Sequence, residues 1–257
     1  MGTGSITGYI DVAQIALYVF WIFFAGLVYY LHAENKREGY PLESERSGHV
    51  DVQGFPPIPS PKTFLLRDGT TVSVPNALRE EQEIAAEPNG AYLGAPLEPI
   101  GNPMLAGVGP GAWAQRADRP DTTVDGDARI VPLRAAGAGF GVAGKDPNPI
   151  GLPVIGADGV VAGTVTDLWV DRAEMVFRYL EVAVSSGAQP RSVLLPFNFS
   201  KIDHQRVRVR SILGAQFEWV PTTRLPDRVT LLEEDKIMAF YGGGTLYATP
   251  SRQEPLL

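Results

Sequence analysis

The sequence predicts a single membrane-spanning helix at the N-terminus, followed by a mainly-β domain that forms a small barrel and ends in a helix. Three observations support this: an uninterrupted apolar run over Val12–Leu31, short β-patterned segments from about residue 128, and a capped helical pattern near the C-terminus. The chain has no cysteine, so disulfides and thiolate metal sites are excluded. Its net charge of −7 argues against a nucleic-acid partner.

The apolar run, VAQIALYVFWIFFAGLVYYL, contains no charged residue. Twenty helical residues span roughly 30 Å, the thickness of the bilayer core. A signal peptide is disfavoured because no Lys or Arg precedes the run and bulky residues end it. A core helix would show a polar face, which this run lacks. We therefore expect a transmembrane helix over residues 12–33. Lys36 and Arg37 follow it, so the positive-inside rule predicts a periplasmic segment 1–11 and a cytoplasmic C-terminal domain.

Residues 34–120 are predicted to be an extended linker rich in proline and glycine. Twelve of the 22 prolines lie between residues 41 and 120, and strand-like patterns are confined to short pieces such as Lys62–Leu66 and Thr70–Val74. A solvated linker would not keep many large apolar side chains, yet this one contains Phe55, Met104 and Trp113. We therefore expect it to press against another surface, either its own domain or partner subunits.

Residues 121–257 are predicted to form the barrel domain. Strands are expected over Arg129–Leu133, Leu152–Ile155, Val160–Val170, Phe177–Val184, Arg191–Pro196 and Arg206–Ile212, at a spacing typical of small barrels. A helix is expected over Thr230–Tyr241, where Thr230 is the N-cap and acidic residues fill the first turn. The triplet Gly242-Gly243-Gly244 is expected to stop this helix.

Catalytic motifs are absent from the sequence: it has no GxSxG, P-loop or HExxH pattern, and its histidines lie in separate segments. An independent enzyme active site is therefore not expected. Carboxylates are instead dense around the first strand and the central turn: Asp118, Asp121, Asp125, Asp127, Asp167, Asp171, Glu174 and Glu181, with Arg172 and Arg178 interleaved. Two interpretations stay open, a solvated acidic surface and a proton-conducting route through carboxylates and water.

Many stretches, in order along almost the whole chain, resemble the H subunit of the purple-bacterial photosynthetic reaction centre. They include Phe20–Leu27, Lys36–Leu42, Pro61–Phe64, Gly101–Met104, Gly107–Pro110, Gly151–Val154, Ala162–Asp171, Arg178–Val182, Leu232–Lys236 and Gly243–Ala248. The resemblance implies a PRC-type β-barrel and a single-pass protein of the bacterial inner (intracytoplasmic) membrane. It also implies that the domain caps the L and M subunits on the cytoplasmic side and assists proton delivery to the secondary quinone.

The same resemblance implies a set of proton-transfer residues. By position, Glu174 matches a carboxylate near the secondary quinone site, and Asp171 and Arg178 match its charged neighbours; an ion pair that only holds the barrel is the alternative role for Glu174 and Arg178. Asp125 matches an acidic position near the family's proton entrance. Asp127, with Arg129, falls where some members carry histidines, which titrate in a different range. This departure weakens the assignment of Asp125 and Asp127 to an entrance.

Partners and cofactors also follow from the resemblance. The L and M subunits are the expected partners, with membrane lipids and, in addition, a cytochrome subunit and light-harvesting antenna helices. No cofactor is expected on this chain alone; bacteriochlorophyll, bacteriopheophytin, quinones and a non-haem iron are expected in the L and M subunits. The alternative is a membrane-tethered PRC-barrel adaptor unrelated to photosynthesis. A relationship to ribosome-maturation proteins, which share the barrel type, is disfavoured by the anchor and the acidic charge.

Overall fold

The computed structural model describes residues 4, 6–7, 10–43, 50–52, 54–67, 69–76, 84–92, 94–185 and 191–253. The chain forms two compact units: Met1–Glu80 with Tyr92–Gly94, and Glu81–Ala91 with Ala95–Leu257. Most of the predicted periplasmic segment 1–11 lies outside the described residues. Each unit is described by itself below.

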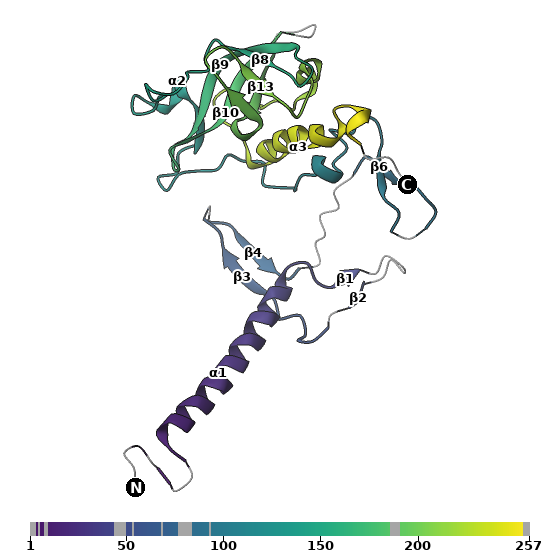
Figure 1. The fold of residues 1–257 in the computed structure, drawn as a ribbon. Helices are drawn as coiled ribbons and strands as arrows, with labels where there is room; N and C mark the ends of the chain where they lie inside the picture. The colour runs from purple at the N-terminus through teal and green to yellow at the C-terminus, as the bar shows by residue number, and fades with distance from the viewer. Residues whose placement is uncertain are drawn as a thin grey trace. The chain divides into compact units, whose positions relative to one another are not determined.

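The first unit begins with the long helix α1 (Val12–Glu34), drawn in purple in Figure 1. Asp11 caps it: its carboxylate accepts a hydrogen bond from the Gln14 amide at 2.7 Å, and the Gln14 side chain accepts one from the Asp11 amide at 3.2 Å. No residue of α1 is buried within the chain, and its length and hydropathy suffice to cross a membrane. The predicted N-terminal apolar helix is therefore confirmed as a candidate membrane span.

Two basic residues in the short 3-10 helix η1 (Asn35–Arg37) tie the following segment to the end of α1. Lys36 and Arg37 are both buried. The Lys36 ammonium donates to the Pro56 carbonyl at 2.5 Å, and the Arg37 guanidinium donates to the carbonyls of Ser60 and Val74 at 2.6 and 3.1 Å. Buried cations need such acceptors, so these bonds hold the chain turned back toward the helix end.

Three short antiparallel hairpins follow within the region predicted as a linker. Strand β1 (Leu42–Glu43) pairs with β2 (Val50–Val52), β3 (Lys62–Leu65) with β4 (Thr71–Val74), and β5 (Ala86–Pro88) with β6 (Leu97–Pro99). The pair β3–β4 lies where the sequence showed its two strand-like pieces. The first two hairpins belong to the first unit, and β5–β6 belongs to the second.

The second unit is built on a seven-stranded sheet. Its strands are β7 (Ile130–Pro132), β8 (Pro153–Ile155), β9 (Val161–Asp171), β10 (Val176–Val184), β11 (Arg191–Pro196), β12 (Ser200–Ile202) and β13 (Val207–Val209). They follow the order β11-β10-β9-β8-β13-β12, with β7 paired to the C-terminal part of β9. All neighbours are antiparallel except β13 and β8. The predicted mainly-β domain is confirmed, and β12 is a strand that the sequence pattern did not predict.

Short helical elements connect and cover these strands: η2 (Gly109–Gly111), α2 (Leu133–Ala136), η3 (Phe197–Phe199), η4 (Gly214–Trp219) and η5 (Pro250–Arg252). The core lies between the sheet and the C-terminal helix α3 (Leu231–Tyr247), which runs alongside the sheet in Figure 1. Trp169 from β9 and Phe240 and Tyr241 from α3 are among the largest fully buried side chains. Burying each such group contributes roughly 1.5–3 kcal/mol.

The start of α3 matches the prediction and its end does not. Thr230 caps the helix by accepting a hydrogen bond from the Glu233 amide at 3.1 Å, as expected. The glycine triplet, predicted to stop the helix, lies inside it, because α3 continues to Tyr247. These glycines allow close packing: a Cβ on Gly242 would stand 2.7 Å from the Pro110 carbonyl oxygen. Tertiary contacts therefore outweigh the low helix propensity of glycine.

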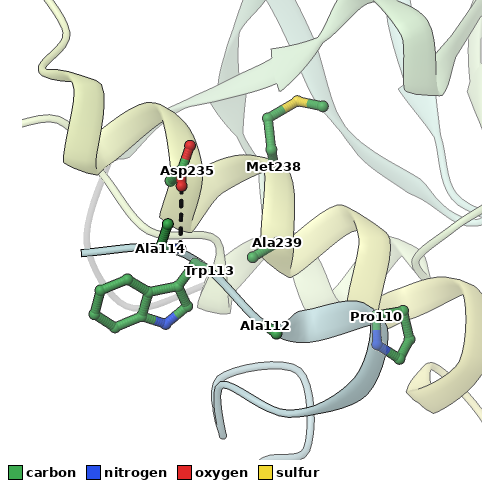
Figure 2. Close-up of a pocket in the computed structure, with 7 residues that line it drawn as sticks. All are labelled: Pro110, Ala112, Trp113, Ala114, Asp235, Met238 and Ala239. Atoms are coloured by element: carbon green, nitrogen blue, oxygen red, sulfur yellow. Dashed lines mark hydrogen bonds between the residues drawn. The ribbon is translucent and has the colours of Figure 1, made fainter. Parts of the chain in front are cut away.

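Part of the predicted linker packs on this same domain. Met104, Ala106 and Val108 are buried, and Met104 belongs to the main core. Figure 2 shows the next residues lying along α3, where the Ala114 amide donates to Asp235 at 3.1 Å. A shallow cavity of about 500 Å³ lies between this segment and the helix. The linker was expected to press against its own domain or partner subunits. Residues 104–114 pack against the protein's own domain.

Candidate functional site

A buried carboxylate, Asp171, is the centre of the site. It is the last residue of β9, its side chain is fully buried, and Oδ1 accepts hydrogen bonds from the amides of Ala173 and Glu174, each at 3.0 Å. Aspartate is favoured at turns because its side chain can bond the backbone amides that follow it. The local sequence thus forms the turn that leads from β9 into β10.

Two guanidinium groups converge on Asp171, one from β10 and one from the residue before β7. The Arg129 Nε donates to both carboxylate oxygens at 3.0 Å, and the Arg178 Nη2 donates to Oδ2 at 3.1 Å. Arg178 comes from β10, the other arm of the hairpin. Arg129 directly precedes β7, and the pairing of Ile130 with Asp171 brings it to the turn. A buried carboxylate needs such partners to remain ionised.

Two further carboxylates complete the group. Glu174 bridges the cations: Oε1 accepts from Arg129, and Oε2 accepts from the Arg178 Nη2 at 2.6 Å. Asp121 accepts from the Arg129 Nη1 at 3.0 Å. We call these five residues the Asp171 cluster. Exposure rises outward through it, from 0% for the Asp171 side chain to 52% for that of Glu174.

The environment keeps Asp171 charged. Burial opposes ionisation of its carboxyl group, but hydrogen bonds from Arg129, the Glu174 amide, Arg178 and the Ala173 amide hold its pKa below the usual value. Asp171 is consequently ionised at neutral pH and fixes the positions of the two guanidinium groups. The structure thus brings together three of the five predicted residues, Asp171, Glu174 and Arg178.

Asp125 and Asp127 lie outside the Asp171 cluster. Asp125 is exposed and has no hydrogen bond or ion pair with any residue that the structure describes. The Asp127 side chain is 72% exposed, and its carboxylate lies 3.9 Å from the Arg172 Nη2, too far for a hydrogen bond. Both residues are acidic surface groups in this chain.

Asp167 and Glu181, which the sequence pattern grouped with the central turn, form a separate network in the middle of β9 and β10. They are paired across the two strands. The Arg134 Nη1 donates to both carboxylates at 2.7 Å, and the Trp169 indole donates to Glu181 at 2.9 Å. These four side chains satisfy one another, so this network is a structural element that joins α2 to the sheet.

One further acidic residue, Glu234, was not among the site residues predicted from the sequence. It lies in α3 and lines a cavity of about 470 Å³ together with Arg178, Tyr179 and Arg116. Its carboxylate accepts a hydrogen bond from the Tyr179 hydroxyl at 2.8 Å. Burial raises the pKa of the Glu234 carboxyl above its usual value, although the Tyr179 hydrogen bond acts in the opposite direction. Glu234 is therefore easier to protonate than an exposed glutamate.

Two of these side-chain pairs, Arg129 with Asp171 and Glu234 with Tyr179, join segments that are far apart in sequence. Arg129 lies 42 residues from Asp171, and Glu234 lies 55 residues from Tyr179. Only the register of β7 on β9 and the packing of α3 bring these groups together. Among the described residues, no group of three or more His, Cys, Asp or Glu side chains is arranged to hold a metal ion.

Comparison with protein-family models gives two matches. Residues 4–135 match the model described as photosynthetic reaction centre, H-chain N-terminal region, and residues 144–216 match the PRC-barrel domain. The first match covers α1, the three hairpins and β7; the second covers β8 to β13, including most of the Asp171 cluster. The H chain is a non-enzymatic, structural subunit of a membrane-associated reaction centre complex. The chain belongs to the family of photosynthetic reaction centre H chains.

Proposed function

We propose that this protein caps the L and M subunits of its reaction centre on the cytoplasmic side and assists proton delivery to the secondary quinone. The match to the H-chain family supports the capping role. The basic residues after α1 support a periplasmic N-terminus and a cytoplasmic barrel in the bacterial inner membrane. Pigments, quinones and a non-haem iron then belong to the L and M subunits.

The Asp171 cluster is the observation that carries the proton-delivery role. Double reduction of a quinone consumes two protons at a site covered by protein, so carboxylates at the covering surface can supply them. Asp171 stays ionised and positions Arg129 and Arg178, while the side chain of Glu174 is half-exposed and reaches solvent. In this proposal Glu174 carries the proton, and Asp171 and Arg178 hold it in place.

Glu234 adds a second carboxylate to this proposal. The cavity that it lines is also lined by Arg178, which belongs to the Asp171 cluster. Its volume is large enough for several water molecules, and Glu234 is held with a raised pKa that favours proton uptake. Water in such a cavity can connect Glu234 to Arg178 and so to the Asp171 cluster.

Helix α1 is proposed to pack on one side against the L–M pair. Its residues Ala25 and Gly26 are small, and a Cβ on Gly26 would meet no atom of the chain within 4 Å. Small residues let helices approach closely in membranes. The remaining apolar surface of α1 would face lipid, an antenna helix or other subunits.

Replacing Glu174 with glutamine tests the proton-delivery role. We expect the proton-coupled transfer of the second electron to the secondary quinone to slow by about tenfold, less than the usual effect of removing a proton-transfer group because other carboxylates remain. Flash-induced absorbance changes, recorded in isolated reaction centres from about pH 6 to pH 9, measure this rate.

Two control variants accompany Glu174→Gln. Glu174→Asp keeps a titratable carboxylate and should retain most of the rate. Asp227→Asn removes the charge of a surface carboxylate, which accepts hydrogen bonds from the adjacent Arg228. This variant should leave the rate unchanged. An unchanged rate in Glu174→Gln across the whole pH range would refute the proton-delivery role.

Affinity purification tests the capping role directly. A tagged form of this protein, extracted from host membranes in mild detergent, should bring down L and M subunits with bound bacteriochlorophyll. The near-infrared absorption spectrum of the eluate measures this. A colourless eluate containing the tagged chain alone would contradict the proposal and favour a membrane-tethered adaptor.

A further inference from the structure

A basic cavity in the second unit lies apart from the Asp171 cluster. Its volume is about 410 Å³, within the range of small-molecule sites. It lies between the hairpin β12–β13 and the end of the chain around η5. Its charged and polar lining includes Lys201, Arg208, Arg210, Ser211 and Arg252.

The cavity gathers positive charge in a chain whose net charge is −7. Among the described residues, Arg252 donates to backbone carbonyls, those of Ser211 and Gly244 at 2.6 Å and that of Arg210 at 2.9 Å, and pairs with no carboxylate. Within the described part of the chain, the side chains of Lys201 and Arg210 form no ion pair. The four cations therefore face a shared space with little compensating charge.

Within the described residues, the carboxylate of Asp203 lies near this group. Asp203 lies 3.6 Å from the Arg208 Nη2 and 3.7 Å from the Arg206 Nε, both beyond hydrogen-bond distance. Amides of Gln205 and Arg206 also donate to it at 2.9 Å. Asp203 is thus mainly engaged by its own turn and offsets only part of the charge on Arg208.

Two buried donors at the cavity have no hydrogen-bond partner among the residues that the structure describes. Ser211 is 5% exposed, and its hydroxyl forms no hydrogen bond with any described residue. The Arg208 Nε is buried and unpartnered in the same sense. Buried donors are almost always paired in native proteins. Both groups are therefore available to an acceptor that enters the cavity from outside the chain, and the surrounding cations favour one with negative charge.

We propose that the basic cavity binds a phosphate group, supplied either by a free phosphate compound or by a phospholipid headgroup. A phosphate presents several strong acceptor oxygens and up to two negative charges, which suit two unpartnered donors surrounded by four cations. A single carboxylate would neutralise less of this charge. The site is independent of the proposed proton route.

Calorimetric titration of the purified complex with inorganic phosphate at low ionic strength is the first test. We expect saturable binding that weakens with added salt. The variant Arg210→Gln should weaken it about tenfold, because an exposed cation at the cavity is lost. The variant Arg228→Gln is the matched control: it removes a half-exposed arginine that pairs with Asp227 outside the cavity, and should leave binding unchanged.

Ser211→Ala gives a sharper test because binding and stability should respond differently. Without phosphate, removing a buried hydroxyl that has no partner should leave the melting temperature unchanged or raise it. Phosphate binding should nevertheless weaken about fivefold, the effect of losing one hydrogen bond to a charged acceptor. A hydroxyl already bonded inside the protein would instead lower the melting temperature when removed, which would count against the site.

A second arm distinguishes the two sources of phosphate. Short-chain phosphatidylglycerol, titrated as a monomer, is compared with inorganic phosphate on the same variants. Tighter binding of the lipid that depends on Arg210 assigns the site to a headgroup, and tighter binding of inorganic phosphate assigns it to a soluble ligand. Binding of neither, or binding that Arg210→Gln and Ser211→Ala leave unaltered, overturns the proposal.

Discussion

Asp171→Asn is expected to lower the free energy of unfolding of the barrel domain by about 3 kcal/mol, at the low end for breaking a buried ion pair. Asparagine can keep one acceptor for the amides of Ala173 and Glu174 but places an NH₂ group toward the guanidinium groups of Arg129 and Arg178. Both arginines are partly exposed, so water recovers some of the loss. Urea unfolding of the detergent-solubilised chain, followed by fluorescence of the buried Trp169, measures the change.

The pH dependence of stability gives this prediction a second readout. The pKa of Asp171 is lower in the folded than in the unfolded chain, where it is near 3.9. The stabilisation is therefore complete above that value and is lost as the pH falls through the lower, folded-state pKa. The destabilisation caused by Asp171→Asn should be full at pH 7 and shrink in acid below about pH 4.

Asp125→Asn is the control for Asp171→Asn. It makes the same chemical change on an exposed side chain with no described partner and should alter the free energy of unfolding by less than about 0.5 kcal/mol. Equal effects of the two variants at neutral pH would show that burial and pairing of Asp171 do not stabilise the fold.

Gly244→Ala is expected to destabilise the barrel domain by about 2 kcal/mol, even though alanine is the better helix former. The gain in helix propensity is about 1 kcal/mol. Against it, the new Cβ would stand 2.6 Å from the Ser211 carbonyl oxygen and would overlap the Ile212 side chain. Overpacking against backbone that cannot move freely typically costs more than this gain. Thermal unfolding monitored by circular dichroism measures the balance.

Gly139→Ala is the control for Gly244→Ala. A Cβ at Gly139 would meet no atom within 4 Å, and this glycine does not have a positive φ. We expect this variant to be as stable as the wild type or slightly more stable, because alanine restricts the unfolded chain. A stabilising effect of Gly244→Ala would mean that α3 can shift away from the segment after β13.

The sequence predicted the helices and strands whose patterns lie within a few contiguous residues. Alternation predicted β9, and a run of β-forming residues predicted β10, each to within one residue at either end; the Thr230 cap predicted the start of α3. It missed β12, which has only three residues and forms because β13 lies beside it. It also ended α3 too early at Gly242, because propensity carries no information about what packs against a glycine.

In the candidate site too, the sequence predicts the local contacts and misses the long-range ones. The turn after β9 places Asp171, Glu174 and Arg178 within eight residues, so their proximity could be predicted from the hairpin alone. The partnership of Arg129 with Asp171 depends on β7 pairing with β9, and Glu234 meets Tyr179 only because α3 packs on the sheet. No local pattern encodes contacts across 42 and 55 residues.

By itself, the sequence determined an N-terminal helix long and apolar enough to span a membrane, the β-rich domain and the resemblance to reaction centre H chains, because hydropathy, alternation and ordered motifs are properties of contiguous residues. The tertiary structure alone decided which charges are neutralised and which are not. It buried Asp171 among two arginines, left Asp125 and Asp127 on the surface, and gathered four cations around Ser211, of which only Arg208 pairs with a described carboxylate, that of Asp203. The physical reason is that burial and pairing, which set the energy of a charge, arise from segments distant in sequence.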